Sequence, residues 1–244
     1  MHRGSSRAWF AGGVAALVHA AGVLAAGAIG ASAWDDTPVA RLEALALIQT
    51  LDAQILSSSS ATLMLEQWCR QHGLADPPLI LARRTDTAPE PPTAATRADL
   101  QLGAQDQVRY RRVELTCGRH ILSVAENWYV PQRLTADMNR QLDGQTPFGK
   151  VVLPLRPHRE TIAAQLLWSP LPAGWEVGTA VQPASEGRLQ LPAALFEHRA
   201  VLYTAGHVAI AEVHEVYQRD LLAFPQPRWP DSPAHSGHSL APQP

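Results

Sequence analysis

Two β-rich runs joined by a very short turn constrain the fold of this chain more than any other feature. The runs are "QVRYRRVELTC" (107–117) and "HILSVAENWYVP" (120–131), and Gly118-Arg119 separates them. A glycine in so short a connection between strand-like runs is typical of a β-hairpin. The stretch "HRAVLYTAGHVAIAEVHEVY" (198–217) has the same pattern around Ala205-Gly206, so a second hairpin is expected near the end of the chain.

Helical patterns precede and separate these hairpins. "TPVARLEALALIQTLDAQILS" (37–57) predicts an amphipathic helix, and a serine run followed by Gly73 bounds a second helix over about 60–72. The first helix carries its apolar residues at helical spacing, at Leu42, Leu45, Ile48, Leu51 and Ile55. "LTADMNRQL" (134–142) predicts a short inserted helix, with Thr135 as its N-cap.

The remaining segments are less regular. "PLILARRT" (78–85) and residues near 162–168 are strand candidates, and the Pro-rich segment 86–99 is too broken for regular structure. The order of elements predicts an α+β domain with an antiparallel β-sheet, N-terminal helices and an inserted helix. Whether residues 153–191 form a lid is left open.

Composition limits the classes of function. The chain has 244 residues, 46% of them hydrophobic, which suits one sizeable core. The formal net charge is −2 and no block of like charge stands out, so a nucleic-acid partner is not expected. We expect a monomer.

The first 33 residues have the pattern of an export signal. A basic start, "MHRGSSR", precedes the apolar run "AWFAGGVAALVHAAGVLAAGAIG" (8–30) and an A-x-A site at Ala31-Ser32-Ala33. We therefore expect a signal peptide over 1–33, a domain over 34–222, and a disordered Pro/His/Ser-rich tail over 223–244. Cleavage after Ala33 would give a periplasmic or secreted protein that has no membrane contact. The run is also long enough to remain as an uncleaved membrane anchor.

The cysteines and histidines are few. Cys69 and Cys117 could pair in an oxidising compartment or remain as buried free thiols, and their spacing does not decide between the two. No zinc motif is present and His214 and Glu215 point to opposite faces of one strand, so no metal site is expected.

Strand parity identifies two polar positions. In "YRRVELTC", Arg112 lies on the polar face beside Glu114, where a solvated Arg/Glu pair is the simplest interpretation. In the last strand, Glu212 shares its face with Val208, Ile210, His214 and Val216. A carboxylate there is buried with a cationic partner, kept protonated by desolvation, or placed at a wet rim.

The order of "YRRVELTCGRHILSVAENWYVP", a helix, "TPFGKVV" and "HRAVLYTAGHVAIAEV" resembles the chorismate lyase family over about 75–217. The resemblance implies a chorismate lyase-like fold. It also implies elimination of pyruvate from chorismate, or from a related enolpyruvyl cyclohexadiene acid, to give 4-hydroxybenzoate without a cofactor.

The resemblance gives five expected site residues, and Asn127 is the one that departs from the family's pattern. The resemblance places the catalytic pair at Arg112 and Glu212, with Arg112 also binding a substrate carboxylate. In the Thr-Pro-Phe-Gly turn, Phe148 would offer its backbone N–H to a substrate carboxylate, and Gly149 beside it is also expected to bind the substrate. Asn127 stands where relatives often carry an arginine. A protonated Glu212 could hydrogen-bond the departing ring oxygen.

The same pattern is similar to UTRA domains, the effector-binding parts of many bacterial regulators. The alternative function is therefore a non-catalytic, exported binding module for a small aromatic carboxylic acid. Glu212 separates the two interpretations, because the lyases need an acid at this position and a binding module does not. Whether catalysis is retained, and what would supply chorismate outside the cytoplasm, are left open.

Overall fold

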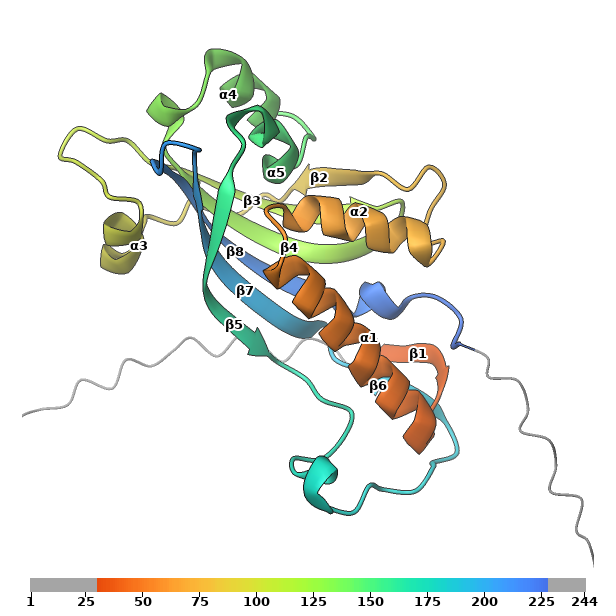
Figure 1. The fold of residues 1–244 in the computed structure, drawn as a ribbon. Coiled ribbons are helices and arrows are strands. Elements are labelled where there is room, and N and C mark those ends of the chain that lie inside the picture. Colours follow the sequence, from red (N-terminus) through yellow and green to blue (C-terminus); the bar gives the residue numbers. More distant parts are fainter. Residues whose placement is uncertain (1–29, 228–244) are drawn as a thin grey trace, which may run out of the picture.

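A computed structural model describes residues 30–227 of the chain. Its centre is a six-stranded sheet in the order β2-β3-β4-β8-β7-β5, and all neighbouring strands are antiparallel (Figure 1). The predicted α+β class with an antiparallel sheet is confirmed. The strands are β2 Ile80–Arg84, β3 Arg109–Cys117, β4 His120–Tyr129, β5 His158–Leu166, β7 Ala194–Tyr203 and β8 Ala209–Gln218.

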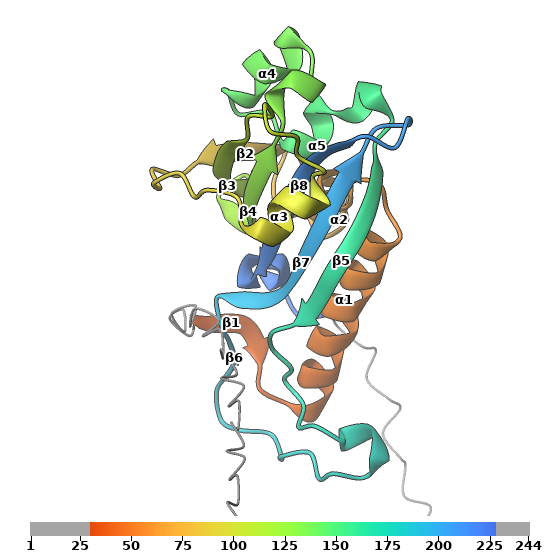
Figure 2. The same ribbon diagram turned by 90° about the vertical axis from the view of Figure 1, so that its left-hand side faces the viewer.

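Helices cover the sheet unequally. The two longest, α1 (Pro38–Leu56) and α2 (Ala61–Gln71), lie against one face, and Figure 2 shows α3 (Ala94–Asp99) on the opposite face. The short helices α4 (Ala136–Leu142) and α5 (Phe148–Val151) lie together at one end of the sheet. Single 3₁₀ turns complete the helical content, at η1 Pro131–Arg133, η2 Leu153–Leu155, η3 Trp175–Val177 and η4 Arg219–Leu222.

Both predicted hairpins form, but only in the first does the glycine supply the positive φ of the turn, because in the second the residue with a positive φ is His207 and not Gly206. Gly118 adopts φ +54° in the turn between β3 and β4, in the left-handed region that favours glycine. Val113, Leu115 and Cys117 are buried in the core under α1 and α2, as strand parity predicts. The β7–β8 hairpin turns between Tyr203 and Ala209.

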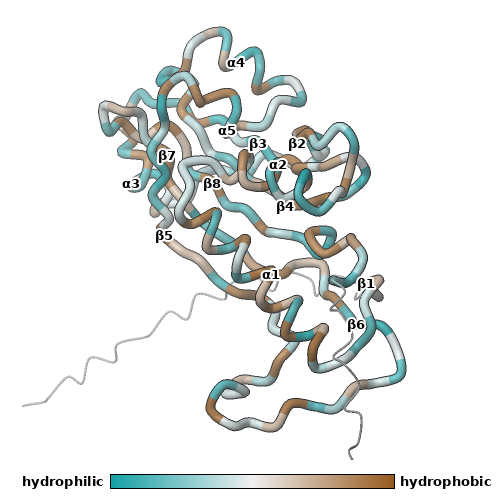
Figure 3. Tube along the Cα trace, turned by 45° about the vertical axis from the view of Figure 1, so that its right-hand side comes forward, coloured by the Kyte–Doolittle hydropathy of each residue, from teal (hydrophilic) through white to brown (hydrophobic). Residues whose placement is uncertain are grey.

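The predicted helices are also present, with clear starts. Thr37 accepts a hydrogen bond from the amide of Ala40 and caps α1, with Pro38 at the first helical position. Ser60 caps α2 and Thr135 caps α4 in the same way. One expected core position is wrong, because Leu42 is 45% exposed while Leu45 and Ile48 are buried. Figure 3 shows hydrophobic and hydrophilic stretches alternating along α1.

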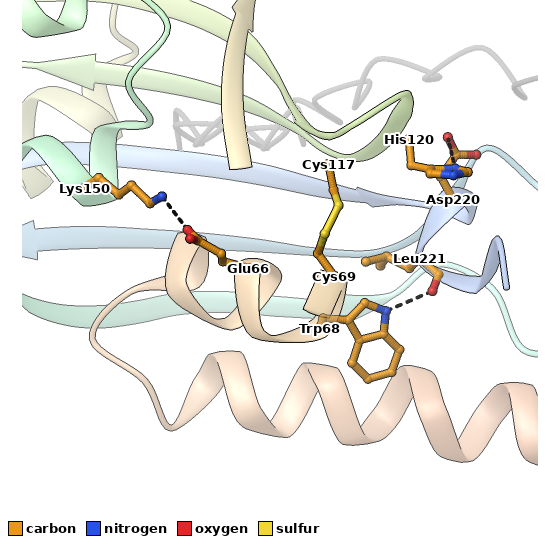
Figure 4. The surroundings of a disulfide bond; sticks show 8 residues. All are labelled: Glu66, Trp68, Cys69, Cys117, His120, Lys150, Asp220 and Leu221. Atoms are coloured by element: carbon orange, nitrogen blue, oxygen red, sulfur yellow. Dashed lines mark hydrogen bonds and ion pairs between the residues drawn. A yellow bond between two sulfur atoms is a disulfide. The ribbon is translucent and has the colours of Figure 1, made fainter. Parts of the chain in front are cut away.

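Cys69 of α2 and Cys117 of β3 form a disulfide, which settles the pairing that the sequence left open (Figure 4). Their Cα atoms are 6.3 Å apart, and 48 positions separate them in sequence. The bond fastens α2 to the sheet. Beside it, the indole N–H of Trp68 donates to the carbonyl of Leu221 at 2.9 Å, so the C-terminal turn η4 is held against the same helix (Figure 4).

Three short elements were not expected from the sequence. Helix α3 forms inside the Pro-rich segment, capped by Thr93, and α5 begins directly after Pro147, where only a turn was expected. Strand β1 (Gly30–Asp35) pairs with β6 (Arg188–Leu191) in a separate two-stranded sheet. β1 therefore overlaps the last residues of the expected signal peptide.

The expected tail and signal peptide fall mostly outside the described residues. Of the tail, Phe224 is described and buried, two residues beyond the expected domain boundary at Leu222. Between residues 30 and 227, none of the helices is long and apolar enough to cross a membrane.

Candidate functional site

A small polar cavity lies between the helix-covered face of the sheet and the first residues of α2 and α5. Its volume is about 30 Å³, room for one or two water molecules. Its sheet wall is apolar and is made by Val113, Leu115, Ala125, Leu202 and Val213. Three polar side chains interrupt this wall, from Asn127 of β4, Arg159 of β5 and Glu215 of β8. A polar group in such a wall is costly to bury unless it is paired or binds something.

Arg159 and Glu215 form a buried ion pair in the wall of the cavity. Arg159 Nη2 lies 2.8 Å from Glu215 Oε2, and the side chains are 3% and 8% exposed. The hydroxyl of Tyr217 donates to the same carboxylate at 3.2 Å. Burial alone would lower the pKa of Arg159, but the charge of Glu215, the nearby Tyr217 and the short contact with the Glu215 carboxylate together outweigh it, so the pKa is raised. Arg159 is therefore a permanent cation beside the cavity.

Three polar atoms of the cavity wall are buried without a hydrogen-bond partner among the described residues, namely Nε and Nη2 of Arg159 and Oδ1 of Asn127. Nη2 still forms the ion pair with Glu215, so the two that remain are the Nε donor of Arg159 and the Oδ1 acceptor of Asn127. Both side chains are almost fully buried, and an unpaired buried donor or acceptor costs about 1–3 kcal/mol. Native structures pair most such groups with protein, water or a ligand. A bound molecule that supplies an acceptor and a donor would satisfy both.

Helix α2 points its N-terminal end at the same cavity. Ser59, Ser60 and Thr62 line it, and Ser60 Oγ accepts from the amide of Leu63 at 3.4 Å. An 11-residue helix carries a partial positive charge at its N-terminus, where backbone N–H groups remain unpaired within the helix. The cavity thus combines a guanidinium with a helix N-terminus, and both favour an anion.

Gly149 allows α5 to sit directly over this helix end. A Cβ atom at Gly149 would lie 2.8 Å from Thr62 Oγ1 and 3.0 Å from Ser60 Oγ, closer than packed atoms allow. The next residue, Lys150, forms an ion pair with Glu66 of α2 (Figure 4). These two contacts hold α5 over the cavity and explain why a glycine follows Phe148.

The structure brings three of the five predicted site residues together. Asn127, Phe148 and Gly149 all line the cavity. Arg112 and Glu212 do not, because the residues that stand opposite Asn127 in the sheet are Arg111 and Val213. Their sequence neighbours Arg112 and Glu212 point to the other face of the sheet. The predicted arginine and glutamate therefore lie across the sheet from the predicted backbone contact.

Glu212 has the buried, paired environment that was one of its expected states. It is fully buried and forms an ion pair with Arg199 of β7, while its second oxygen has no partner among the described residues. Ile210 does not share this environment as expected. It packs in the cluster of α4 and α5, because the β7–β8 register shifts between Leu202 and Tyr203.

The face that carries Arg112 and Glu212 holds a second group of charged residues. His214 Nδ1 lies 3.4 Å from Glu126 Oε2, and its Nε2 lies 3.1 Å from Glu197 Oε2. The hydrogen bond to Glu126 is the main reason that the pKa of His214 is raised, and His214 in turn lowers the pKa of Glu126. The expected Arg112–Glu114 pair is absent, since Glu114 pairs with Arg83 instead.

Arg111, next to Arg112, has a structural role that parity did not suggest. Its side chain is buried and its Nη2 donates to the carbonyls of Gly144 and Thr146, at 3.0 and 3.1 Å. Burial lowers its pKa to about 10. Arg111 therefore fastens the segment that leads into α5 to the sheet.

Arg159 and Glu215 were not identified from the sequence as site residues. Arg159 lies in the segment 153–191, whose pattern was hard to interpret. Glu215 lies between Val213 and Tyr217 on one face of β8, so it is a carboxylate among apolar residues. The same kind of pattern identified Glu212 on the other face. No group of His, Cys, Asp and Glu between residues 30 and 227 could hold a metal ion.

Comparison with known proteins places the chain in a family. No family model matches the sequence. The chain belongs to the family of the uncharacterized protein y4mC of Sinorhizobium fredii, with 43% identity over 196 residues, or 80% of this chain and 83% of that protein.

Solved structures with partial similarity include bacterial regulators. They include PhnF from Mycobacterium smegmatis (TM-score 0.38, 14% identity, 60% of this chain) and the effector domain of PhnF (TM-score 0.37, 13% identity, 58% of this chain). A GntR-family transcriptional regulator from Enterococcus faecalis matches with a TM-score of 0.36 and 10% identity over 61% of this chain. The matches cover 61%, 82% and 96% of those chains, so this chain spans about three fifths of the length of PhnF.

Proposed function

We propose that this protein is an exported binding module for a small carboxylic acid, held in the cavity between α2, α5 and the sheet. The observation that carries the proposal is the free Nε donor of Arg159, buried beside the cavity with the N-terminus of α2 at its other side. A carboxylate matches both, because a guanidinium and helix N–H groups are the donors that it prefers. Asn127 supplies a further polar contact.

An aromatic ring suits the rest of the cavity. Its wall is lined by aliphatic side chains and by Phe148, so a flat apolar body would replace water there with favourable contacts. The present volume of about 30 Å³ is too small for a ring. Binding therefore requires α5 to move away from α2, which means separating Gly149 from Thr62 and Lys150 from Glu66.

The positions of the charged residues favour binding over catalysis. The lyase interpretation needs Arg112 and Glu212 in the substrate pocket, and both point to the other face of the sheet. The carboxylate that does reach the cavity, Glu215, is occupied by Arg159 and Tyr217. These two contacts hold the Glu215 carboxylate in the cavity wall, so it is not directed at a substrate oxygen as the lyase interpretation requires of its glutamate.

Calorimetry with 4-hydroxybenzoate tests this proposal, with 4-hydroxybenzamide as an uncharged ligand of the same shape. The acid should bind and the amide should not. Arg159→Lys keeps the charge beside Glu215 but removes the planar guanidinium and its Nε donor. The affinity for 4-hydroxybenzoate should therefore fall at least about tenfold, which corresponds to the loss of one hydrogen bond to a charged group. Arg199→Lys is the matched control, since Arg199 also pairs with a buried glutamate, but on the opposite face.

The same samples distinguish a binding module from an enzyme. During incubation with chorismate, the absorbance of 4-hydroxybenzoate should rise no faster than it does without the protein. Turnover that Glu212→Gln abolishes would overturn the proposal and restore the lyase. Equal affinity for acid and amide, or equal losses in Arg159→Lys and Arg199→Lys, would contradict the assigned cavity.

A further inference from the structure

The expected signal-peptide cleavage site lies inside a strand of the folded domain. β1 runs from Gly30 to Asp35 and pairs with β6, with Gly30 opposite Leu191, Ala31 opposite Gln190 and Asp35 opposite Arg188. The A-x-A site, Ala31-Ser32-Ala33, occupies the middle of this strand. Figures 1 and 2 show β1 beside β6, next to the end of α1 at which the chain enters that helix.

The residue after the site is one of the most buried in the protein. Trp34 is 1% exposed, and its indole N–H donates to the carbonyl of Phe224 at 2.7 Å. Its ring meets that of Phe224 edge to face at a centroid distance of 5.7 Å. Trp34 therefore joins the two ends of the described chain through the core.

Residues on the N-terminal side of Trp34 hold it in place. Ser32 Oγ accepts from the backbone N–H of Trp34 at 3.1 Å, and the carbonyl of Ala33 accepts from Arg188 Nη1 at 2.8 Å. The partner strand β6 contributes Leu189 and Leu191 to the main core. β1 thus protects the edge of a strand whose side chains are part of that core.

Cleavage after Ala33 would remove much of this arrangement. Four of the six residues of β1, from Gly30 to Ala33, would leave with the signal peptide, together with both acceptors described above. The new α-ammonium group would lie on Trp34, whose side chain is in the core, and an ionised group is costly to place beside apolar surroundings. β6 would lose the pairing at Gln190 and Leu191.

We infer that the protein is not cleaved at Ala33 and keeps its N-terminal apolar segment as a membrane anchor. Residues 8–29, which precede β1, form a run of 22 without Asp, Glu, Lys or Arg, and about 20 apolar residues are enough to cross a bilayer. Arg3 and Arg7 precede the run, and basic residues stay on the cytoplasmic side. The domain then lies on the outer side, where the Cys69–Cys117 disulfide persists.

The inference concerns where the domain is held and does not depend on what its cavity binds. The membrane anchor and the binding function can therefore be tested separately, since a soluble protein could still bind a carboxylate and an anchored one could bind none.

The test uses the full chain, produced in a Gram-negative host with a C-terminal tag. Cells are fractionated, membranes are washed with alkaline carbonate, and the mass of the detergent-extracted protein is measured. The expected result is a membrane-bound protein with the mass of the whole chain, 26.4 kDa plus the tag. A soluble periplasmic protein, whatever its first residue, would overturn the anchor.

Ala33→Gln provides the matched control. Signal peptidase needs a small residue directly before the cut, so this variant blocks cleavage. Ala33 is exposed, and glutamine keeps the backbone carbonyl that Arg188 contacts, so the fold should be retained and can be checked by near-ultraviolet circular dichroism. Wild type and Ala33→Gln should fractionate identically. A soluble wild type beginning at Trp34, beside a membrane-bound Ala33→Gln, would show that cleavage occurs and refute the inference.

Discussion

Gly149 of α5 and Thr62 of α2 approach each other so closely that a single added methyl group would not fit. The Cβ of an alanine at position 149 would lie 2.8 Å from Thr62 Oγ1 and 3.0 Å from Ser60 Oγ. Both hydroxyls belong to short, buried side chains at the start of a helix, and Ser60 is its cap. This contact closes the cavity, so it links the stability of the domain to access to the proposed site.

Gly149→Ala should therefore destabilise the domain by about 1–3 kcal/mol, the usual cost of inserting a methylene into a packed site. For a domain of this size the melting temperature should fall by about 2–4 °C for each kcal/mol. Thermal unfolding followed by circular dichroism measures the change. At Gly187 an added Cβ meets no atom within 4 Å, so Gly187→Ala is the control and should melt like wild type. An unchanged melting temperature in both variants would mean that α5 does not rest on α2.

The ion pair between Arg159 and Glu215 should be costly to break from one side. Glu215→Gln keeps the shape and the contact with Tyr217 but leaves the guanidinium of Arg159 buried without its counter-charge. Removing one partner of a buried pair typically costs about 3–5 kcal/mol. Urea unfolding at neutral pH gives the free energy of unfolding.

Arg84→Gln is the comparison for this prediction. Arg84 and Asp143 are 3.9 Å apart with side chains 55% and 64% exposed, and such surface pairs contribute about 0–1 kcal/mol. Similar small losses in Glu215→Gln and Arg84→Gln would indicate that Arg159 reaches solvent and is not a buried cation.

Local sequence signals were sufficient to predict most elements of the fold. The caps at Thr37, Ser60 and Thr135 act within their own helices, and Gly118 supplies its turn by itself. Such features depend only on a few neighbouring residues, so they can be predicted from a single sequence. β1 was missed for a related reason, because "GASAWD" (30–35) has the small residues of a cleavage site and its partner β6 lies more than 150 positions away.

The candidate site was only partly predictable, because parity separates the faces of a strand without showing which face forms a cavity. Glu212 and Glu215 are both carboxylates on β8, and strand parity together with the family resemblance favoured Glu212. The choice depends on α1 and α2, which cover the face of Glu215, and on Arg159, which reaches that face from β5. These are contacts between distant segments, and no local pattern encodes them.

The stability of the protein should decrease as the pH rises through the titration of His214. Glu126 and Glu197 flank its ring, and Arg199 stands opposite it on β7. The hydrogen bond to Glu126 is the main cause of its raised pKa, so the folded state binds the proton more tightly than the unfolded state, whose pKa is 6.5. The stabilisation is therefore complete below about pH 6.5 and is lost as the pH rises through the folded pKa.

Urea unfolding of wild type and His214→Gln between pH 6 and pH 9 measures this difference. The free energy of unfolding should fall with pH in wild type, and the fall should be smaller in the variant. Below pH 6.5 a different residue contributes, because burial lowers the pKa of His198 and that contribution is lost as the pH decreases. Parallel curves for wild type and variant above pH 6.5 would contradict the arrangement of His214 between its two carboxylates.

The Cys69–Cys117 disulfide should account for a large part of the stability of the domain. It closes a loop of 48 positions, for which the loss of chain entropy in the unfolded state corresponds to about 4 kcal/mol. Cys69→Ala/Cys117→Ala should therefore melt well below wild type, and reductant should lower the melting temperature of wild type toward that of the double variant. The double variant should not respond to reductant, which controls for other effects of the reagent. The contrary result is that reductant leaves the melting temperature of wild type unchanged and the double variant melts at the same temperature as wild type. That result would mean that packing around Trp68 and Leu65 holds α2 to β3 and that the covalent bond adds nothing.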